Sequence, residues 1–130
     1  MCPKCNIPML ILEWKGVEID MCLECRGIWL DEGELELISE RAGVDPGRLT
    51  KALQEAGKGK IGKRECPRCD KKLRQVHVQG QTPLDLDECP EGHGIWFDQG
   101  ELRTLIGSHE QGEEGAVARF FADLLHDQIS

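Results

Sequence analysis

The sequence predicts a small α+β protein made of two similar units and a connecting segment. Three observations support this class. A nine-residue run occurs twice, short apolar stretches lie between pairs of cysteines, and segments with helix-start signals follow them. Only 5% of the 130 residues are aromatic and 31% are charged, so units of this size bury too little apolar surface to be stable alone. We therefore expect each unit to need a metal, disulfides or a partner.

A duplication organises the chain. The run Gly27–Leu35 recurs 67 residues later as Gly94–Leu102, and seven of the nine positions are identical. The motif C-P-x-C at Cys2 recurs 64 residues later at Cys66. Such self-similarity defines the structural unit. The second repeat has three extra residues between its cysteine motifs, where they should lengthen a hairpin.

Each repeat is expected to contain a β-hairpin followed by a short helix. The strands of the first repeat are expected at 9–12 and 17–21, and those of the second at 73–78 and 84–86. Asp31 and Glu34 have the spacing of a helix N-cap and its reciprocal partner, and the second repeat has the same arrangement. The other residues expected in these helices are Asp98 with Glu101, the buried Leu35, Ile38, Leu102 and Leu105 or Ile106, and the helix ends Gly43 and Gly107.

Two further segments have helical patterns. Asp45-Pro46 should begin a connecting helix that ends at Gly57, and residues 57–63 have the composition of a flexible hinge. The C-terminus from about Glu113 has apolar residues at three- and four-residue intervals, which predicts an amphipathic helix. The apolar positions are Leu49, Ala52 and Leu53 in the connecting helix and Val117, Phe120, Phe121, Leu124, Leu125 and Ile129 in the C-terminal one.

The cysteines of the first repeat predict a metal site. Cys2 and Cys5 are separated by 16 residues from Cys22 and Cys25, and this spacing is typical of a tetrahedral four-thiolate zinc site. The odd total of seven cysteines argues against a closed disulfide framework, so we expect a reducing, cytoplasmic setting. Free or redox-active thiols are one alternative, and four cysteines also leave iron open as the metal.

The second repeat offers Cys66, Cys69 and Cys89 but no fourth cysteine. Aligning the two runs places Gly92 opposite Cys25, with His93 one residue later. Because an imidazole reaches further than a thiol, His93 is the predicted fourth ligand. His77 is the rival, but it lies in the middle of an expected strand.

Both predicted sites have four protein ligands, so we expect two structural Zn²⁺ ions and no catalytic residue. Trp29 and Trp96 occupy the same place in both repeats, which favours packing beside the metal over stacking on nucleic-acid bases. The capping spacing explains Glu34 and Glu101 without catalytic chemistry. The sequence therefore does not predict an enzyme.

Taken together, these motifs resemble the transcription factor IIB-type zinc-finger family of small prokaryotic proteins. The pattern is C-P-x-C, hairpin, C-x-x-C and G-I-W-L-D-x-G-E-L; residues 2–38 match it throughout, and residues 66–106 depart from it at Gly92-His93. The resemblance implies a pair of zinc ribbons and a link to transcription. The expected organisation is a first ribbon with its helix at 1–43, a connecting helix and basic hinge at 44–64, a second ribbon with its helix at 65–107, and an amphipathic helix at 108–130.

The charge distribution leaves two functional hypotheses. Seven thiolates and two zinc ions would change the formal charge from −8 to −11, which favours a non-catalytic module that contacts protein partners over one that binds nucleic acid. Direct nucleic-acid binding through the basic segment 58–74 is the alternative. We also consider a homodimer through the C-terminal helix, and we expect no membrane segment. The basic residues are Lys58, Lys60, Lys63, Arg64, Arg68, Lys71, Lys72 and Arg74.

Overall fold

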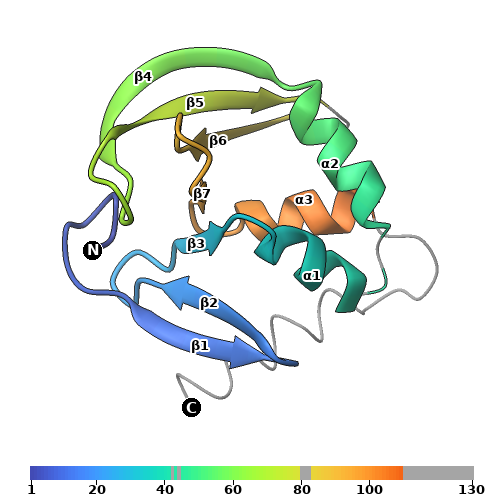
Figure 1. Ribbon diagram of the computed structural model, residues 1–130, viewed down its shortest axis with the longest axis horizontal. Helices are drawn as coiled ribbons and strands as arrows, with labels where there is room; N and C mark the ends of the chain where they lie inside the picture. Colours follow the sequence, from blue (N-terminus) through green and yellow to red (C-terminus); the bar gives the residue numbers. More distant parts are fainter. Residues whose placement is uncertain (42, 44, 80–82, 110–130) are drawn as a thin grey trace.

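A computed structural model of the chain describes residues 1–41, 43, 45–79 and 83–109. Within them, seven strands form one antiparallel sheet in the order β1-β2-β3-β7-β6-β5-β4, accompanied by three helices (Figure 1). The predicted α+β class is confirmed. The elements are β1 (Leu10–Trp14), β2 (Val17–Met21), β3 (Ile28–Asp31), α1 (Glu34–Arg41), α2 (Pro46–Gln54), β4 (Gly57–Glu65), β5 (Lys72–Val78), β6 (Leu84–Glu88), β7 (Gly94–Phe97) and α3 (Glu101–His109).

The predicted hairpin of the first repeat forms between β1 and β2. Its turn is Lys15-Gly16, whose φ angles of 49° and 82° are both positive, as a two-residue type I′ turn requires. The register places Leu12 opposite Ile19, and both side chains are buried. The second repeat forms the longer hairpin β5–β6 at the expected positions.

The centre of the sheet is a pair of strands that the sequence analysis did not predict. β3 and β7 lie within the two copies of the repeated run, and they pair antiparallel with Trp29 opposite Trp96. Because the two strands are equivalent in sequence, this pairing relates the repeats by a local twofold axis. The repeats therefore share one sheet.

Residues 57–63 were expected to be a flexible hinge, and this expectation is wrong. They belong to β4, which pairs with β5 at the edge of the sheet. Glycine and lysine have weak strand propensity, and the register shifts between Lys58 and Ile61 and between Ile61 and Glu65. Pairing with the edge of β5 outweighs this local preference.

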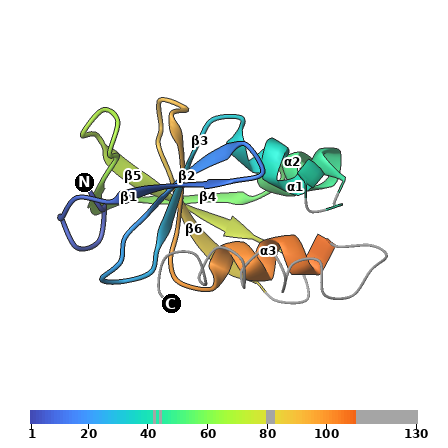
Figure 2. The ribbon, with the colours of Figure 1, turned by 90° about the horizontal axis from the view of Figure 1, so that it is seen from below.

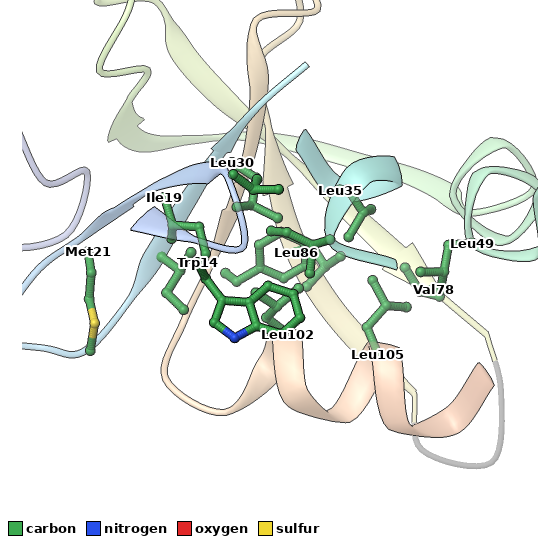
Figure 3. Packing of buried hydrophobic residues seen from close by; sticks show 14 of the residues in the cluster. Trp14, Ile19, Met21, Leu30, Leu35, Leu49, Val78, Leu86, Leu102 and Leu105 are labelled. Atoms are coloured by element: carbon green, nitrogen blue, oxygen red, sulfur yellow. The ribbon is translucent and has the colours of Figure 1, made fainter. Parts of the chain in front are cut away.

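The three helices lie on one side of the curved sheet, and α2 contacts both α1 and α3 (Figures 1 and 2). The main hydrophobic core lies between these helices and the sheet, where Trp14 and Leu30 of the first repeat meet Leu86 and Leu102 of the second (Figure 3). The predicted buried positions Leu35, Ile38, Leu49, Leu102 and Leu105 are confirmed, and Ala52 with Leu53 packs against the same core.

The helix ends follow the predictions in part. Gly43 has a positive φ and donates its N–H to the Glu40 carbonyl, so it terminates α1 as expected. The connecting helix α2 ends at Gln54 and does not reach Gly57, while α3 continues past Gly107 to His109. The predicted helix from Glu113 and the side chain of Ile106 lie outside the described residues. Within the described part of the chain, every helix is too short or too polar to cross a bilayer.

Candidate metal centre

Three of the four cysteine motifs form the same tight turn. In the first, the Asn6 N–H donates to the Cys2 carbonyl at 2.8 Å and the Cys2 N–H donates to the Ile7 carbonyl at 2.7 Å. The residue after the second cysteine has a positive φ, which is 59° at Asn6. The backbone N–H of Cys5 also points at the Cys2 sulfur, 3.2 Å away. The turns at Cys22 and Cys66 repeat this geometry with Arg26 and Asp70 in the positive-φ position.

Site 1 is the group of Cys2, Cys5, Cys22 and Cys25. Their four sulfurs all lie within 4.8 Å of one another, and the sulfurs of Cys2 and Cys25 are 3.7 Å apart. Two sulfurs on one tetrahedral zinc ion, each at about 2.3 Å, lie about 3.8 Å apart. Cys2 and Cys22 are buried at the base of the site, so the donor set and its spacing fit a zinc ion.

Site 2 is the group of Cys66, Cys69, Cys89 and His93, whose ligand atoms also lie within 4.8 Å of one another. The Cys89 sulfur is 3.6 Å from the Cys69 sulfur and 3.3 Å from His93 Nδ1. These distances fit a tetrahedral ion held by three sulfurs and one imidazole. The structure therefore brings together all eight residues that were predicted to be ligands.

A change of backbone conformation explains why the fourth ligand of site 2 lies one residue later. Gly92 stands at the position of Cys25 and has a φ of 81°, whereas in site 1 the positive φ belongs to the following residue, Arg26. The turn of the second repeat therefore tightens by one residue, and the Gly92 N–H donates to the Cys89 carbonyl. This conformation brings His93 to the vacant corner, where its side chain remains exposed.

His77, the rival ligand, does not join site 2. It lies on β5, where its Nδ1 is 2.6 Å from Asp85 Oδ1 on β6. Its ring also lies over Gly59 of β4, since a Cβ atom at Gly59 would be only 2.6 Å from His77 Nε2. These neighbours account for His77 without a metal.

Comparison with known protein families agrees with this geometry. A family model described as a transcription factor zinc-finger matches residues 1–41 and 65–108, which include both repeats and more than half of the chain. The chain belongs to the transcription factor zinc-finger family. The resemblance inferred from the motifs is thereby confirmed, and both zinc-ribbon repeats are matched. No curated protein and no solved structure shows significant similarity to the chain.

Burial and hydrogen bonds shift the pKa of three ribbon thiols, those of Cys25, Cys66 and Cys89. Burial raises the pKa of Cys25 and of Cys66 to about 12, because a buried thiolate without a cation is poorly solvated. Burial also acts to raise the pKa of Cys89, but the N–H groups of His93 and Glu91 and the His93 ring outweigh it, and this pKa falls to about 7. A divalent cation would stabilise all seven thiolates, so metal binding and proton release are coupled.

The two ribbons are held together by a reciprocal contact between tryptophan and glycine. Trp29 and Trp96 are fully buried in a cluster that contains cysteines from both sites, so the prediction that they are core residues is confirmed. A Cβ atom on Gly27 would lie 2.1 Å from the Trp96 ring, and one on Gly94 would lie 2.7 Å from the Trp29 ring. Each tryptophan thus requires glycine directly after the last ligand turn of the other repeat.

Two pairs of aspartates bind arginine side chains, and these contacts were not predicted from the sequence. Asp20 and Asp31 of the first repeat both accept hydrogen bonds from Arg68. Asp87 and Asp98 occupy the equivalent positions in the second repeat and both bind Arg64, at 3.1 and 3.0 Å. Extending the repeat comparison to the residue two places before Cys22 and Cys89 would have found Asp20 and Asp87, because both positions are aspartate.

The predicted capping pairs are only half correct. The Asp31 N–H donates to Glu34 Oε1 and the Asp98 N–H donates to Glu101 Oε1, both at 2.7 Å, as the reciprocal half of a capping box requires. The other half of the capping box, in which the aspartate side chain caps the helix, is replaced by other contacts. Asp31 accepts from the Trp29 indole at 2.8 Å as well as from Arg68, so it connects the metal face of the sheet to the start of α1.

Proposed function

We propose that sites 1 and 2 each hold a structural zinc ion, and that the protein is a non-catalytic module that contacts other proteins in transcription. The observation that supports this most directly is that each site gathers four protein ligand atoms around one point. A catalytic zinc ion keeps a coordination position for water or substrate, which four protein ligands fill. The family description supports the link to transcription.

Metal analysis of the purified full chain tests the sites. We expect two zinc ions per chain, and one after His93→Ala. His77→Ala is the matched control, because that histidine lies on the neighbouring hairpin and should leave both zinc ions in place. Retention of two zinc ions by His93→Ala, or an iron signal in site 1, would refute this assignment.

The surface beside site 1 is the best place for a protein contact. Ile7 follows the first cysteine turn of the first repeat and Leu23 lies within the second, and they are 38% and 43% exposed. The second repeat has Lys71 and Pro90 at the equivalent positions. Exposed apolar side chains around a rigid metal turn are typical of a protein interface.

A capture experiment with the zinc-loaded chain tests this surface. A specific partner should be retained by the unchanged protein and lost with the double variant Ile7→Asp/Leu23→Asp. The control is Ile61→Asp, which places an aspartate at an exposed apolar position on β4. Zinc content is measured for every variant. If the double variant keeps two zinc ions and still retains the partner, the contact lies elsewhere.

Nucleic-acid binding through residues 58–74 has less support. Six of the eight basic residues in this segment form ion pairs with carboxylates of the same chain, including Lys58 with Glu88 at 2.9 Å. In the described part of the chain, only Lys60 and Lys63 of this set lack such a pair. The overall negative charge also repels phosphate. Salt-sensitive binding to DNA or RNA that Lys60→Glu/Lys63→Glu abolishes would favour this function instead.

A further inference from the structure

The two edges of the sheet differ in how well they are protected against pairing with a strand of another molecule. Among the described strands, β4 forms one edge and β1 the other. The strand equivalent to β1 in the second repeat is β5, and β5 is covered by β4. The first repeat has no corresponding described strand, so β1 presents the edge that its counterpart buries.

β4 has the features that prevent one sheet from pairing with another. It contains Lys58, Lys60 and Lys63, and its pairing with β5 has two register shifts. Edge lysines repel an approaching lysine-rich strand, and bulges twist the edge away from a partner. A second β4 is therefore a poor partner for this edge.

β1 has none of these features. Its sequence Leu-Ile-Leu-Glu-Trp lacks lysine and proline, and its pairing with β2 is regular over all five residues. Leu10 is 43% and Ile11 is 68% exposed, whereas the equivalent positions on β5 are Arg74 and Gln75. An exposed, regular and apolar edge strand is a template for a further strand.

We propose that β1 pairs antiparallel with β1 of a second molecule of this chain, about a twofold axis at Ile11. The two seven-stranded sheets then continue into one. This interface is distinct from the predicted C-terminal helix, and it does not depend on the function proposed above.

The register follows from the side chains. With the axis at Ile11, this residue lies opposite its own copy, Leu10 lies opposite Leu12 of the second molecule, and Glu13 lies opposite Met9. Directly opposite residues contact each other in an antiparallel pair, and like charges there are unfavourable. An axis at Glu13 would place two glutamates opposite each other, and an axis at Leu12 would place Ile11 opposite Glu13. The axis at Ile11 instead places the most exposed apolar side chain of β1 opposite its own copy.

The molecule already contains this kind of pairing. β3 and β7 are equivalent strands that pair antiparallel about a local twofold axis, with Trp29 opposite Trp96. Pairing of β1 with β4 of another molecule would instead be heterologous and would form open-ended chains. A five-residue edge buries less than the roughly 800 Å² per partner of a standard interface, so the dimer should be reversible and concentration-dependent.

Sedimentation equilibrium of the zinc-loaded full chain tests the proposal. The unchanged protein should form a dimer as its concentration rises. Ile11→Lys and Ile11→Glu should each raise the dimer dissociation constant by at least about tenfold, because each places two like charges opposite each other on the axis. The matched control Ile61→Lys changes an exposed apolar residue on β4 and should alter this constant by less than about twofold.

A mixture of variants tests the twofold register itself. At a concentration where Ile11→Lys and Ile11→Glu are each monomeric alone, the two variants should associate when mixed, because the lysine of one molecule then lies opposite the glutamate of the other. Zinc content and far-ultraviolet circular dichroism verify that each variant is folded. A chain that stays monomeric at all concentrations, a dimer that survives Ile11→Lys, or a mixture that does not associate would overturn the proposal.

Discussion

The two repeats hold their metal ligands in different ways. Site 1 takes all four ligands from two identical turns, whereas site 2 has one ordinary turn and one that is tightened at Gly92. The fourth ligand of site 1 is the half-buried Cys25, and that of site 2 is the exposed His93. The ribbon thus tolerates a change of ligand type when a glycine with positive φ compensates for the shift along the chain.

The repeats also differ in what neutralises their aspartates. Arg64, from β4 just before the second repeat, binds Asp87 and Asp98 of that repeat. Arg68, from the second repeat, binds Asp20 and Asp31 of the first. The first repeat therefore depends on a side chain of the second, while the reverse contact is not made by Lys4, which has the position of Arg68 in the first repeat. We therefore expect the duplicated units to unfold as one cooperative structure.

The sharpest test of this dependence is Cys66→Ala. Cys66 is fully buried in the cluster that contains both tryptophans and ligands of both sites. Structural zinc contributes about 10–16 kcal/mol of apparent binding free energy, which is comparable with or larger than the stability of a typical small domain. We expect this variant to lose both zinc ions and most of its circular dichroism signal, because Cys66 also packs in the buried cluster that contains Cys2 and Cys22 of site 1. His93 is exposed and lies outside that cluster, so His93→Ala should keep the zinc ion of site 1. If Cys66→Ala keeps site 1 loaded and melts like the unchanged protein, the repeats fold independently.

A second test adds a methyl group where the repeats meet. Gly27→Ala should destabilise the fold by about 3 kcal/mol, because its Cβ overlaps the Trp96 ring. Gly94→Ala should cost more, since its Cβ would also lie 2.2 Å from the Leu30 carbonyl oxygen, a backbone atom that cannot rotate away. Chemical denaturation measures both values. Gly62→Ala is the control, because its nearest neighbour is 3.8 Å away. Equal effects at all three positions would contradict the reciprocal packing.

The residues that were predictable from the sequence are those whose role follows from local spacing. Cysteine spacing predicted the seven cysteines of the two sites, and alignment of the two repeats added His93. The apolar stretches on either side of Lys15-Gly16 predicted the first hairpin. The β3–β7 pair was not predictable in this way, because its strands are four residues long and lie 66 positions apart. β4 was not predictable for a similar reason. Its glycines and lysines favour a linker, and the segment becomes a strand only because it pairs with the edge of β5.

The dependence of the first repeat on Arg68 gives a prediction of intermediate size. Arg68→Ala would leave the buried Asp20 and the neighbouring Asp31 without their cation. Because the guanidinium is partly exposed, we expect a loss of about 1–2 kcal/mol in the free energy of unfolding. Arg64→Ala should have a similar cost and act on the second repeat.

The control for both arginine variants is Lys71→Ala, which removes the exposed pair with Glu91 and should have no measurable effect. Hydrogen exchange distinguishes the repeats. Arg68→Ala should increase exchange in β2 and β3, while Arg64→Ala should increase it in β6 and β7. If Arg68→Ala instead increased exchange in β6 and β7, or if exchange rose equally across the sheet, the result would argue that Arg68 does not stabilise the first repeat.

The smallest effect on stability is expected at Glu101, whose counterpart in the first repeat is Glu34. Burial is the main cause that raises the pKa of both, and the nearby Asp98 and Asp87 help to raise that of Glu101 from 4.5 to about 7. A carboxyl group whose pKa is raised in the folded state binds a proton more tightly there than in the unfolded state. Its effect on stability therefore becomes less favourable as the pH rises from about 4.5 to about 7.

Glu101→Gln should remove this loss, because the amide oxygen still accepts from the Asp98 N–H and carries no charge. Since Glu101 is partly exposed, we expect a gain of about 1 kcal/mol at pH values above its pKa, measured by denaturation with excess zinc. Glu34→Gln is the matched variant in the first repeat. A gain from Glu101→Gln that persists unchanged well below the pKa would show that the cause is the shape of the amide and not the titration of a carboxyl group. A flat response at all pH values would mean that Arg64 and the Asp98 N–H already stabilise the charged form fully.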